Sequence, residues 1–388
     1  MKFKISNLNN GLFCFSLISI FFPFKIYPLI FLISSICFLY ERKKIILAPW
    51  IYFLTAYSIY AIGSFIISGN YDELRLTNFY KIFVNFFFLI VTINWLNKKD
   101  VSRLIILIDY TLHFIFFLVF IQLMLYHKAS GFQFLTGVSS SNEGSDIYKP
   151  DLFFWGLDNK NMFGARIATI GFPYILISAV RFNIISLRRI VIVLLLAFFS
   201  MSRTPMLALV LGLLYILWNV KGRLIKVSVF SVIAVITPFF LNSVLRLQTV
   251  TDSNDGMGVR LMYWATFFMN FDKISIWGNG FLSADKFLDQ YALFYLGEPN
   301  IHNTFLNNYL DFGIVGITTY ILFLVYIFKY GKSVYDYKKY WITAFIPLLT
   351  TMMVLFPGYD NDIIVYIILV FIIGQTKDFN YNKLSYSL

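Results

Sequence analysis

Residues 301–328 read IHNTFLNNYLDFGIVGITTYILFLVYIF, and this stretch sets the class of fold. It begins with polar side chains, and from position 312 to its end it carries no charged residue. A helix of about 20 apolar residues spans the hydrocarbon core of a bilayer. The stretch therefore predicts a membrane-spanning helix over residues 304–328 whose first turns meet water on one side of the membrane.

Apolar stretches of the same kind recur along the whole chain. Only 13% of the 388 residues are charged and 59% are hydrophobic, whereas soluble domains carry about 25% charged residues. We therefore expect a single all-α, polytopic membrane domain over residues 1–388, with about twelve spans and no cleaved signal peptide. The expected spans are 8–22, 26–40, 45–67, 79–96, 104–126, 161–180, 190–201, 204–220, 227–244, 304–328, 341–357 and 361–374.

The distribution of charge predicts the orientation of these spans. The chain has a formal net charge of +12, and 20 of its 32 lysines and arginines fall in segments on the side that holds the N-terminus. Only four of the 20 acidic residues share that side. Because basic loops stay in the cytoplasm, both termini are expected to be cytoplasmic, in a bacterial inner membrane. The topology accounts for the positive charge, so no nucleic-acid partner is expected.

Two loops on the opposite, periplasmic side are long. They cover residues 127–160 and residues 245–303, the second between the ninth and tenth spans. Loops of this length are usually functional, so we expect the chemistry to face the periplasm. Within the second loop, residues 259–271 predict an aromatic helix on the membrane surface with Arg260 in its first turn. A structural alternative is an interfacial helix whose Arg260 only reaches the lipid headgroups.

The polar start of the tenth span is the strongest candidate site. Asn303, Asn307 and Asp311 are spaced four residues apart, so they share one helix face. Polar groups at that depth are costly in a membrane and usually line a cavity. His302 stands at the mouth of this face, and an imidazole can accept or donate a proton near neutral pH. The structural alternative is a capping histidine with solvated asparagines.

Two further outward motifs place arginine near polar side chains. Ser202 and Arg203 lie in a tight turn between the seventh and eighth spans. A guanidinium there has the planar fork of donors that binds pyrophosphate. Asn161 and Arg166 lie at the start of the sixth span. The structural alternatives are an arginine anchored at the headgroups and a polar cap on a helix.

Two acidic groups are interpreted as structural. Asp109 and His113 lie four residues apart in the fifth span and are expected to pair on one helix face. Residues 360–362 read DND, which resembles part of a metal site. This triplet lacks a further ligand, so a solvated turn is the expectation and no metal site is predicted.

Taken together, these motifs resemble the O-antigen polymerase and O-antigen ligase family of bacterial membrane enzymes. The resemblance rests on four stretches in this order: Asn161 at the start of a helix, Ser202-Arg203 in a turn, Arg260 with Trp264 and the later Gly278-x-Gly280, and His302-Asn303 with Asp311-x-Gly313-x-x-Gly316. The last stretch is the most specific. The first four spans match the family in hydropathy alone.

The resemblance implies an all-α fold of about twelve spans with a large periplasmic loop between the ninth and tenth. It also implies transfer of a glycan from undecaprenyl pyrophosphate to an acceptor hydroxyl, without a metal or other cofactor. Arg260 and His302 would be catalytic: Arg260 would hold the pyrophosphate, and His302 would orient or deprotonate the acceptor. The residues expected to bind substrate are Arg203, Asn303, Asn161, Arg166, Trp264, Asn307 and Asp311.

The resemblance covers enzymes that polymerise repeat units and enzymes that ligate the finished glycan to lipid A-core. The residues of these motifs favour an O-antigen polymerase, and a ligase is the alternative. Two other classes of protein are weaker alternatives. A lipid-linked oligosaccharide flippase usually shows paired halves, which this sequence does not show. A metal-dependent glycosyltransferase would need an acidic residue in the first outward loop, and residues 23–28 contain none. The expected partners are undecaprenyl-pyrophosphate-linked oligosaccharides, membrane lipid, and a chain-length regulator and flippase of the same pathway.

Overall fold

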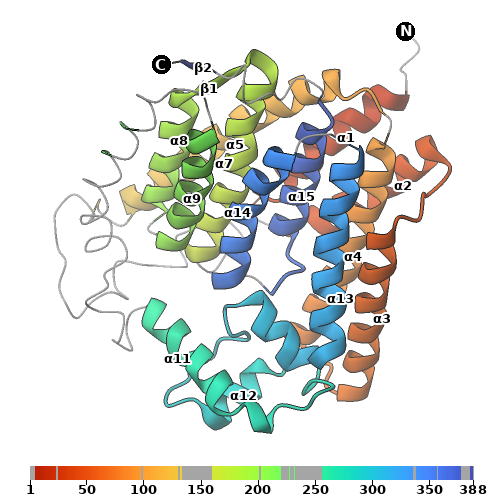
Figure 1. The fold of residues 1–388 in the computed structure, drawn as a ribbon, viewed down its shortest axis with the longest axis vertical. Coiled ribbons are helices and arrows are strands. Elements are labelled where there is room, and N and C mark those ends of the chain that lie inside the picture. The colour runs from red at the N-terminus through yellow and green to blue at the C-terminus, as the bar shows by residue number, and fades with distance from the viewer. Residues whose placement is uncertain are drawn as a thin grey trace.

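The computed structural model describes most of the chain, and the described part is mostly helical (Figure 1). The described residues are 5–22, 25–97, 99–129, 132, 160–200, 202–219, 227, 231, 256–334, 338–355, 357–376 and 385–387. The helices are α1 (Ile5–Ser19), α2 (Tyr27–Arg42), α3 (Pro49–Ser68), α4 (Glu73–Leu96), α5 (Ser102–Ala129), α7 (Lys160–Phe182), α8 (Leu187–Phe199), α9 (Arg203–Asn219), α11 (Gly256–Met269), α12 (Ala284–Tyr291), α13 (Thr304–Val334), α14 (Lys338–Val354) and α15 (Asn361–Gly374).

A helix covers each expected apolar segment that falls within the described residues. The ninth expected span, 227–244, lies almost wholly outside them. Within the described residues, five helices have the length and apolar composition to cross a bilayer on their own: α3, α4, α5, Asn161–Phe182 within α7, and Thr304–Gly331 within α13. Shorter apolar helices accompany them in α9, α14 and α15. The chain is therefore a multi-pass membrane protein, and the count of twelve spans stays a prediction.

The two ends of the helical bundle differ (Figure 1). The start of α1 and the C-terminal strand β2 (Ser385–Ser387) lie at one end, whereas α11 and α12 lie at the other. The side of the membrane that each end faces stays a prediction. The first long loop, 127–160, lies mostly outside the described residues.

One feature departs from the all-α expectation. Strand β1 (Ile184–Ser186), between α7 and α8, pairs in parallel with β2, and Ile184 lies opposite Ser385. The connection between two helices leaves backbone N–H and C=O groups without helical partners, and the C-terminal segment supplies them. The short sheet also ties the C-terminus to the same end of the bundle as the α7–α8 connection.

Asp109 is a structural residue, as expected, but its main partners are arginines from other helices. Its carboxylate accepts from Arg181, at the end of α7, and from Arg189, on α8, with Arg189 Nη1 2.6 Å from Oδ1. His113 contributes less, because its Nδ1 lies 3.6 Å from the carboxylate. The cluster joins α5, α7 and α8, which pairing within one helix would not do.

The expectation of a solvated turn at residues 360–362 is wrong. Asp362 is fully buried, and its carboxylate binds the Arg166 guanidinium with Nε 2.7 Å from Oδ1. Asp360 is only 3% exposed. Local polarity predicts a solvated turn, but a buried cation on α7 compensates the charge of Asp362 in the interior. The segment is buried, and its Asp362 joins the start of α15 to Arg166 on α7.

The predicted topology can be tested with cysteines at exposed positions. Leu293, in the segment after α12, is 93% exposed, and Ser102, at the start of α5, is also exposed. If basic loops are cytoplasmic, an impermeant maleimide added to intact cells labels Leu293→Cys and leaves Ser102→Cys unlabelled until the membrane is opened. The wild-type chain, with Cys14 buried and Cys37 partly buried, gives the background. The reverse labelling pattern would invert the orientation.

Candidate functional site

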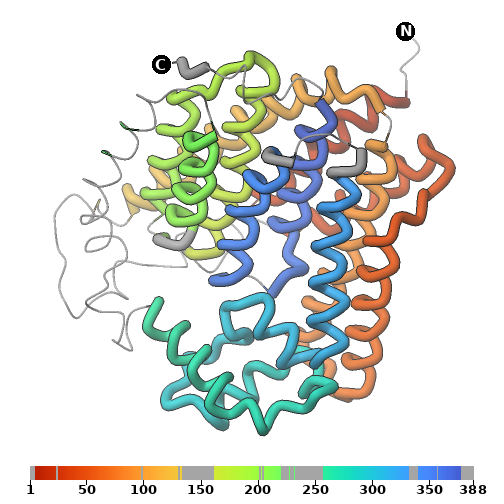
Figure 2. The backbone as a smooth tube through the Cα atoms, viewed as in Figure 1, coloured from red at the N-terminus to blue at the C-terminus, as the bar shows by residue number. Residues whose placement is uncertain are grey.

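The candidate site is organised by a break in α13. At Gly313 the backbone leaves the helical conformation, with φ 58° and ψ −152°. The loop of residues 275–280 packs into this break, and Figure 2 follows the chain from α12 back to the first turns of α13. The amides of Asn279 and Gly280 donate to the carbonyls of Leu310 (2.7 Å) and Asp311 (3.2 Å), and Ile314 donates to Ile276 (2.9 Å). The loop thus takes up hydrogen-bonding groups that the break releases.

Glycines make this close approach possible. A Cβ on Gly313 would lie 2.1 Å from the Ile276 carbonyl oxygen, and one on Gly278 would lie 2.4 Å from the Asp311 carbonyl oxygen. Both residues also have a positive φ, 58° and 89°, a conformation that side chains disfavour. The Gly-x-Gly and Asp-x-Gly motifs found in the sequence therefore lie on the two sides of one backbone contact.

The polar strip at the start of α13 is buried and forms internal hydrogen bonds. Asp311 Oδ1 accepts from the amide (2.9 Å) and hydroxyl (3.0 Å) of Ser283, and Oδ2 accepts from Asn307 (2.9 Å). Asn307 also accepts from the Ile301 amide at 3.2 Å. Asn303 caps α13 by accepting from the amides of residues 305 and 306. In this conformation the strip joins the loop to the helix, and substrate binding by these residues stays a prediction.

His302 lies at the junction of the loop and α13, where its side chain binds Glu298. Its Nε2 lies 2.6 Å from a carboxylate oxygen of Glu298, and its side chain is 12% exposed. The Tyr263 ring lies parallel to it, with the centroids 6.4 Å apart. Trp264 donates to the carbonyl of the preceding residue, Ile301, at 3.1 Å. The sequence motifs predicted the histidine and the tryptophan but not Glu298.

Arg260 lies on α11 one turn before these aromatic residues. Because residues three and four apart share a helix face, Arg260 is on the same side of α11 as Tyr263 and Trp264. Arg260 is 6% exposed. Burial raises the pKa of Tyr263 to about 12, so its hydroxyl stays neutral and accepts from the Leu296 amide at 3.2 Å. α11 thus carries a buried cation one turn before Tyr263, whose ring lies parallel to that of His302.

A second tie holds the loop against α4. The Arg75 guanidinium is buried, and Nη2 lies 2.9 Å from the Leu282 carbonyl oxygen and 2.9 Å from Asp285 Oδ2. Arg75 also binds Asp72, the N-cap residue of its own helix. The sequence does not indicate this cluster, because Leu282 and Asp285 are about 200 residues from Arg75 in the chain and none of the three lies in a motif.

The other two sequence motifs meet at the starts of α7 and α9. The Ser202 hydroxyl donates to Asn161 Oδ1 at 2.9 Å. Gly164 lets the turn approach, because a Cβ there would lie 2.6 Å from Ser200 Oγ and 2.9 Å from Pro205 Cγ. Arg203 begins α9, and its side chain lies outside the described part of the structure. Asn161, Ser202 and the backbone of Arg203 therefore form one cluster.

Arg166 lies deeper on α7 and has protein partners. Besides Asp362, it donates to the carbonyl of Ile20. The turn that contains Asp362 is also tied to α13, where Tyr320 donates to the Gly358 carbonyl at 2.7 Å and Asn308 to the Pro357 carbonyl at 3.3 Å. Residues 357–362 thus connect the first turns of α7 with the first turns of α13. In this arrangement Arg166 has a structural role, and its proposed contact with substrate stays a prediction.

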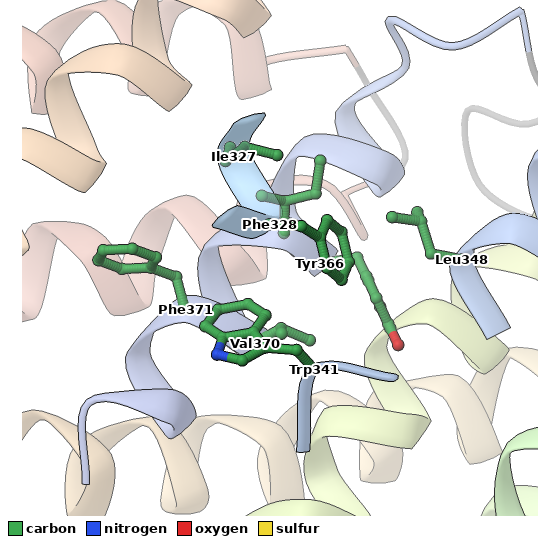
Figure 3. A pocket seen from close by; sticks show the side chains of 8 residues that line it. Ile327, Phe328, Trp341, Leu348, Tyr366, Val370 and Phe371 are labelled. Atoms are coloured by element: carbon green, nitrogen blue, oxygen red, sulfur yellow. The ribbon is translucent and has the colours of Figure 1, made fainter. Parts of the chain in front are cut away.

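Neither a metal cluster nor the apolar pocket adds to this site. Among the residues with described positions, no group of three or more His, Cys, Asp or Glu side chains could hold a metal ion. An apolar pocket lies between α13, α14 and α15 (Figure 3). It is near the end of α13 and the start of α14, far along the helix from His302. The side chains that line it are Ile327, Phe328, Trp341, Leu348, Tyr366, Ile367, Val370 and Phe371.

Comparison with known proteins gives one family match. Residues 189–321 match the family model described as O-antigen ligase. Comparison with curated proteins found no match. The matched range runs from α8 into α13 and contains three of the four stretches on which the resemblance rests. Residues 189–321 are therefore similar to the O-antigen ligase family, which agrees with the resemblance that the sequence motifs carry.

Proposed function

We propose that the protein is a glycosyltransferase of the bacterial inner membrane that polymerises O-antigen repeat units at the periplasmic face. It transfers the growing glycan from undecaprenyl pyrophosphate to a hydroxyl of a lipid-linked repeat unit. The observation that carries this proposal is the arrangement of α11 and the start of α13. A buried arginine, Arg260, and a held histidine, His302, lie in the segment that matches the family.

The chemistry fits these two side chains. When the acceptor hydroxyl attacks the anomeric carbon, the bond to the pyrophosphate breaks and negative charge develops on the leaving oxygens. A guanidinium binds such oxygens with its planar fork, and each hydrogen bond to a charged group contributes about 1.5–3 kcal/mol. His302 accepts the proton of the hydroxyl, and a positioned base of this kind contributes roughly 10²–10⁴-fold. No step in this scheme needs a metal ion or other cofactor.

Arg203 is the second proposed ligand of the pyrophosphate. It is the first residue of α9, and the N-terminus of a helix favours anions because its amides have no helical partners. The contact between Ser202 and Asn161 fixes the turn from which Arg203 starts. The polyprenyl tail of the donor would lie among apolar helices within the bilayer.

A ligase is the second candidate, because the family match does not distinguish the two activities. Both activities use the same donor and differ in the acceptor: a lipid-linked repeat unit for the polymerase, lipid A-core for the ligase. The residues around Ser202, Asn161 and His302 favour the polymerase on sequence grounds. A flippase has the number of spans as its sole support. A chain-length regulator and a flippase of the same pathway are the proposed protein partners.

Deletion of the gene separates the three activities by the surface glycan that remains. A polymerase mutant is expected to show lipid A-core carrying a single repeat unit on a gel, because ligation of one unit still proceeds. A ligase mutant would show undecorated core with polymer retained on the lipid carrier. A flippase mutant would lack lipid-linked intermediates on the outer face. Either of the last two patterns contradicts polymerisation.

The pyrophosphate role of Arg260 predicts a difference between two substitutions. Arg260→Ala is expected to lower kcat/KM by roughly 10²-fold or more, and Arg260→Lys to restore it only partly, because lysine keeps the charge but lacks the bidentate fork. Polymer formation by the purified protein measures both. Lys286→Ala is the matched control, because Lys286 is an exposed cation on α12. A lysine variant as active as wild type would remove the bidentate contact from the mechanism.

A further inference from the structure

The contact between His302 and Glu298 determines which ring nitrogen carries the proton. Glu298 Oε2 lies 2.6 Å from Nε2 of His302, and an ionised carboxylate can only accept a hydrogen bond. A neutral imidazole has one N–H, so this acceptor keeps the proton on Nε2. The lone pair that can take a proton from a substrate is then on Nδ1.

We propose that Glu298 is a positioning residue for His302: it holds the imidazole in the tautomer that directs Nδ1 to the acceptor sugar hydroxyl. The inference rests on the proposed function and extends it to a residue that no sequence motif contains. Glu298 also balances the positive charge that the ring acquires when it takes the proton. Bases in enzymes are commonly oriented by such a third group.

The backbone around His302 supports this role. His302 has φ 56°, in the left-handed region, and its amide donates to Asn300 Oδ1 at 2.9 Å. The next residue, Asn303, caps α13. With the backbone held on both sides and the Tyr263 ring parallel to the imidazole, Glu298 has only the ring orientation and tautomer left to determine.

A purely structural ion pair is a weaker explanation. The Glu298 side chain is 30% exposed, and ion pairs between partly exposed groups contribute little to stability. The loop is already held by the backbone contacts at Gly313 and by Arg75. The carboxylate therefore contributes little to the fold, and its contact with Nε2 leaves Nδ1 for proton transfer.

In the proposed step, His302 takes the proton of the acceptor hydroxyl as the glycosidic bond forms. The acceptor oxygen forms a bond to the anomeric carbon, and the bond from that carbon to the pyrophosphate oxygen breaks with its electron pair leaving on the pyrophosphate. The hydroxyl proton passes to Nδ1 of His302, which becomes an imidazolium whose Nε2–H still donates to Glu298. Release of the Nδ1 proton to water restores the neutral ring.

Two substitutions separate the hydrogen bond from the charge. Glu298→Gln keeps an acceptor oxygen, and Glu298→Leu removes both acceptor and charge. With purified full-length protein in lipid nanodiscs, we expect kcat to fall by about tenfold in the glutamine variant and by about 10²-fold or more in the leucine variant, with KM nearly unchanged. Asp289→Ala is the control, because Asp289 is an exposed carboxylate on α12. Glu298→Leu combined with His302→Ala is expected to be no slower than His302→Ala alone.

Nitrogen NMR of the imidazoles measures the tautomer of His302. This tautomer is not expected to change if Glu298 has only a structural role. The chain has only three histidines, so the His302 signal can be assigned with His302→Ala. We expect the Nε2–H tautomer in wild type, and a mixture of tautomers in Glu298→Leu, where no acceptor remains.

The outcomes distinguish this inference from the proposed function. If His302→Ala is inactive while Glu298→Leu keeps wild-type kcat and tautomer, the positioning role is wrong and the function stands. If His302→Ala polymerises at the wild-type rate, the proposed base is wrong, and the positioning role of Glu298 is wrong as well.

Discussion

The backbone contact at Gly313 is the constraint on which the candidate site depends. A helix inside a membrane cannot leave carbonyl or amide groups without partners, because no water is available to replace them. The break in α13 releases such groups, and the loop of residues 275–280 supplies the missing donors and acceptor. Helix and loop therefore support each other, because the broken helix would be costly without the loop.

The consequences reach from this contact to the proposed chemistry. Asp311, two residues before the break, binds Ser283 and so fixes the start of α12. The first turn of α13 carries Asn303, which holds the backbone next to His302. Residues 357–362 then join α13 to α7, so the two groups of motifs found in the sequence occupy connected parts of one end of the bundle. A site assembled in this way has little freedom to rearrange without disturbing the spans.

The sequence predicted the helices and the motifs well, because apolar length and local spacing are properties of short segments. It predicted Asp109 as a paired residue but not its arginines, and it missed Glu298, Arg75 and the Arg166–Asp362 pair. Apart from Glu298, these contacts join residues distant in the chain, and no spacing rule indicates them. Residues 360–362 are buried although their sequence predicts a solvated turn, because burial depends on what packs against a segment. The structural role of the glycine motifs also follows only from the fold. Gly278 lies against the backbone next to Gly313, and Gly313 lies against the backbone next to Gly278.

A single methyl group at Gly313 tests this account most directly. Gly313→Ala places a Cβ where the Ile276 carbonyl oxygen lies and forces a side chain into a positive φ, whereas Gly63→Ala on α3 meets no atom within 4 Å. Hydrogen exchange measured by mass spectrometry on the purified protein reports the amides of Asn279, Gly280 and Ile314. We predict fast exchange of these amides and loss of polymerisation in Gly313→Ala, with wild-type behaviour in Gly63→Ala. Slow exchange and full activity in Gly313→Ala would contradict the dependence of the site on this contact.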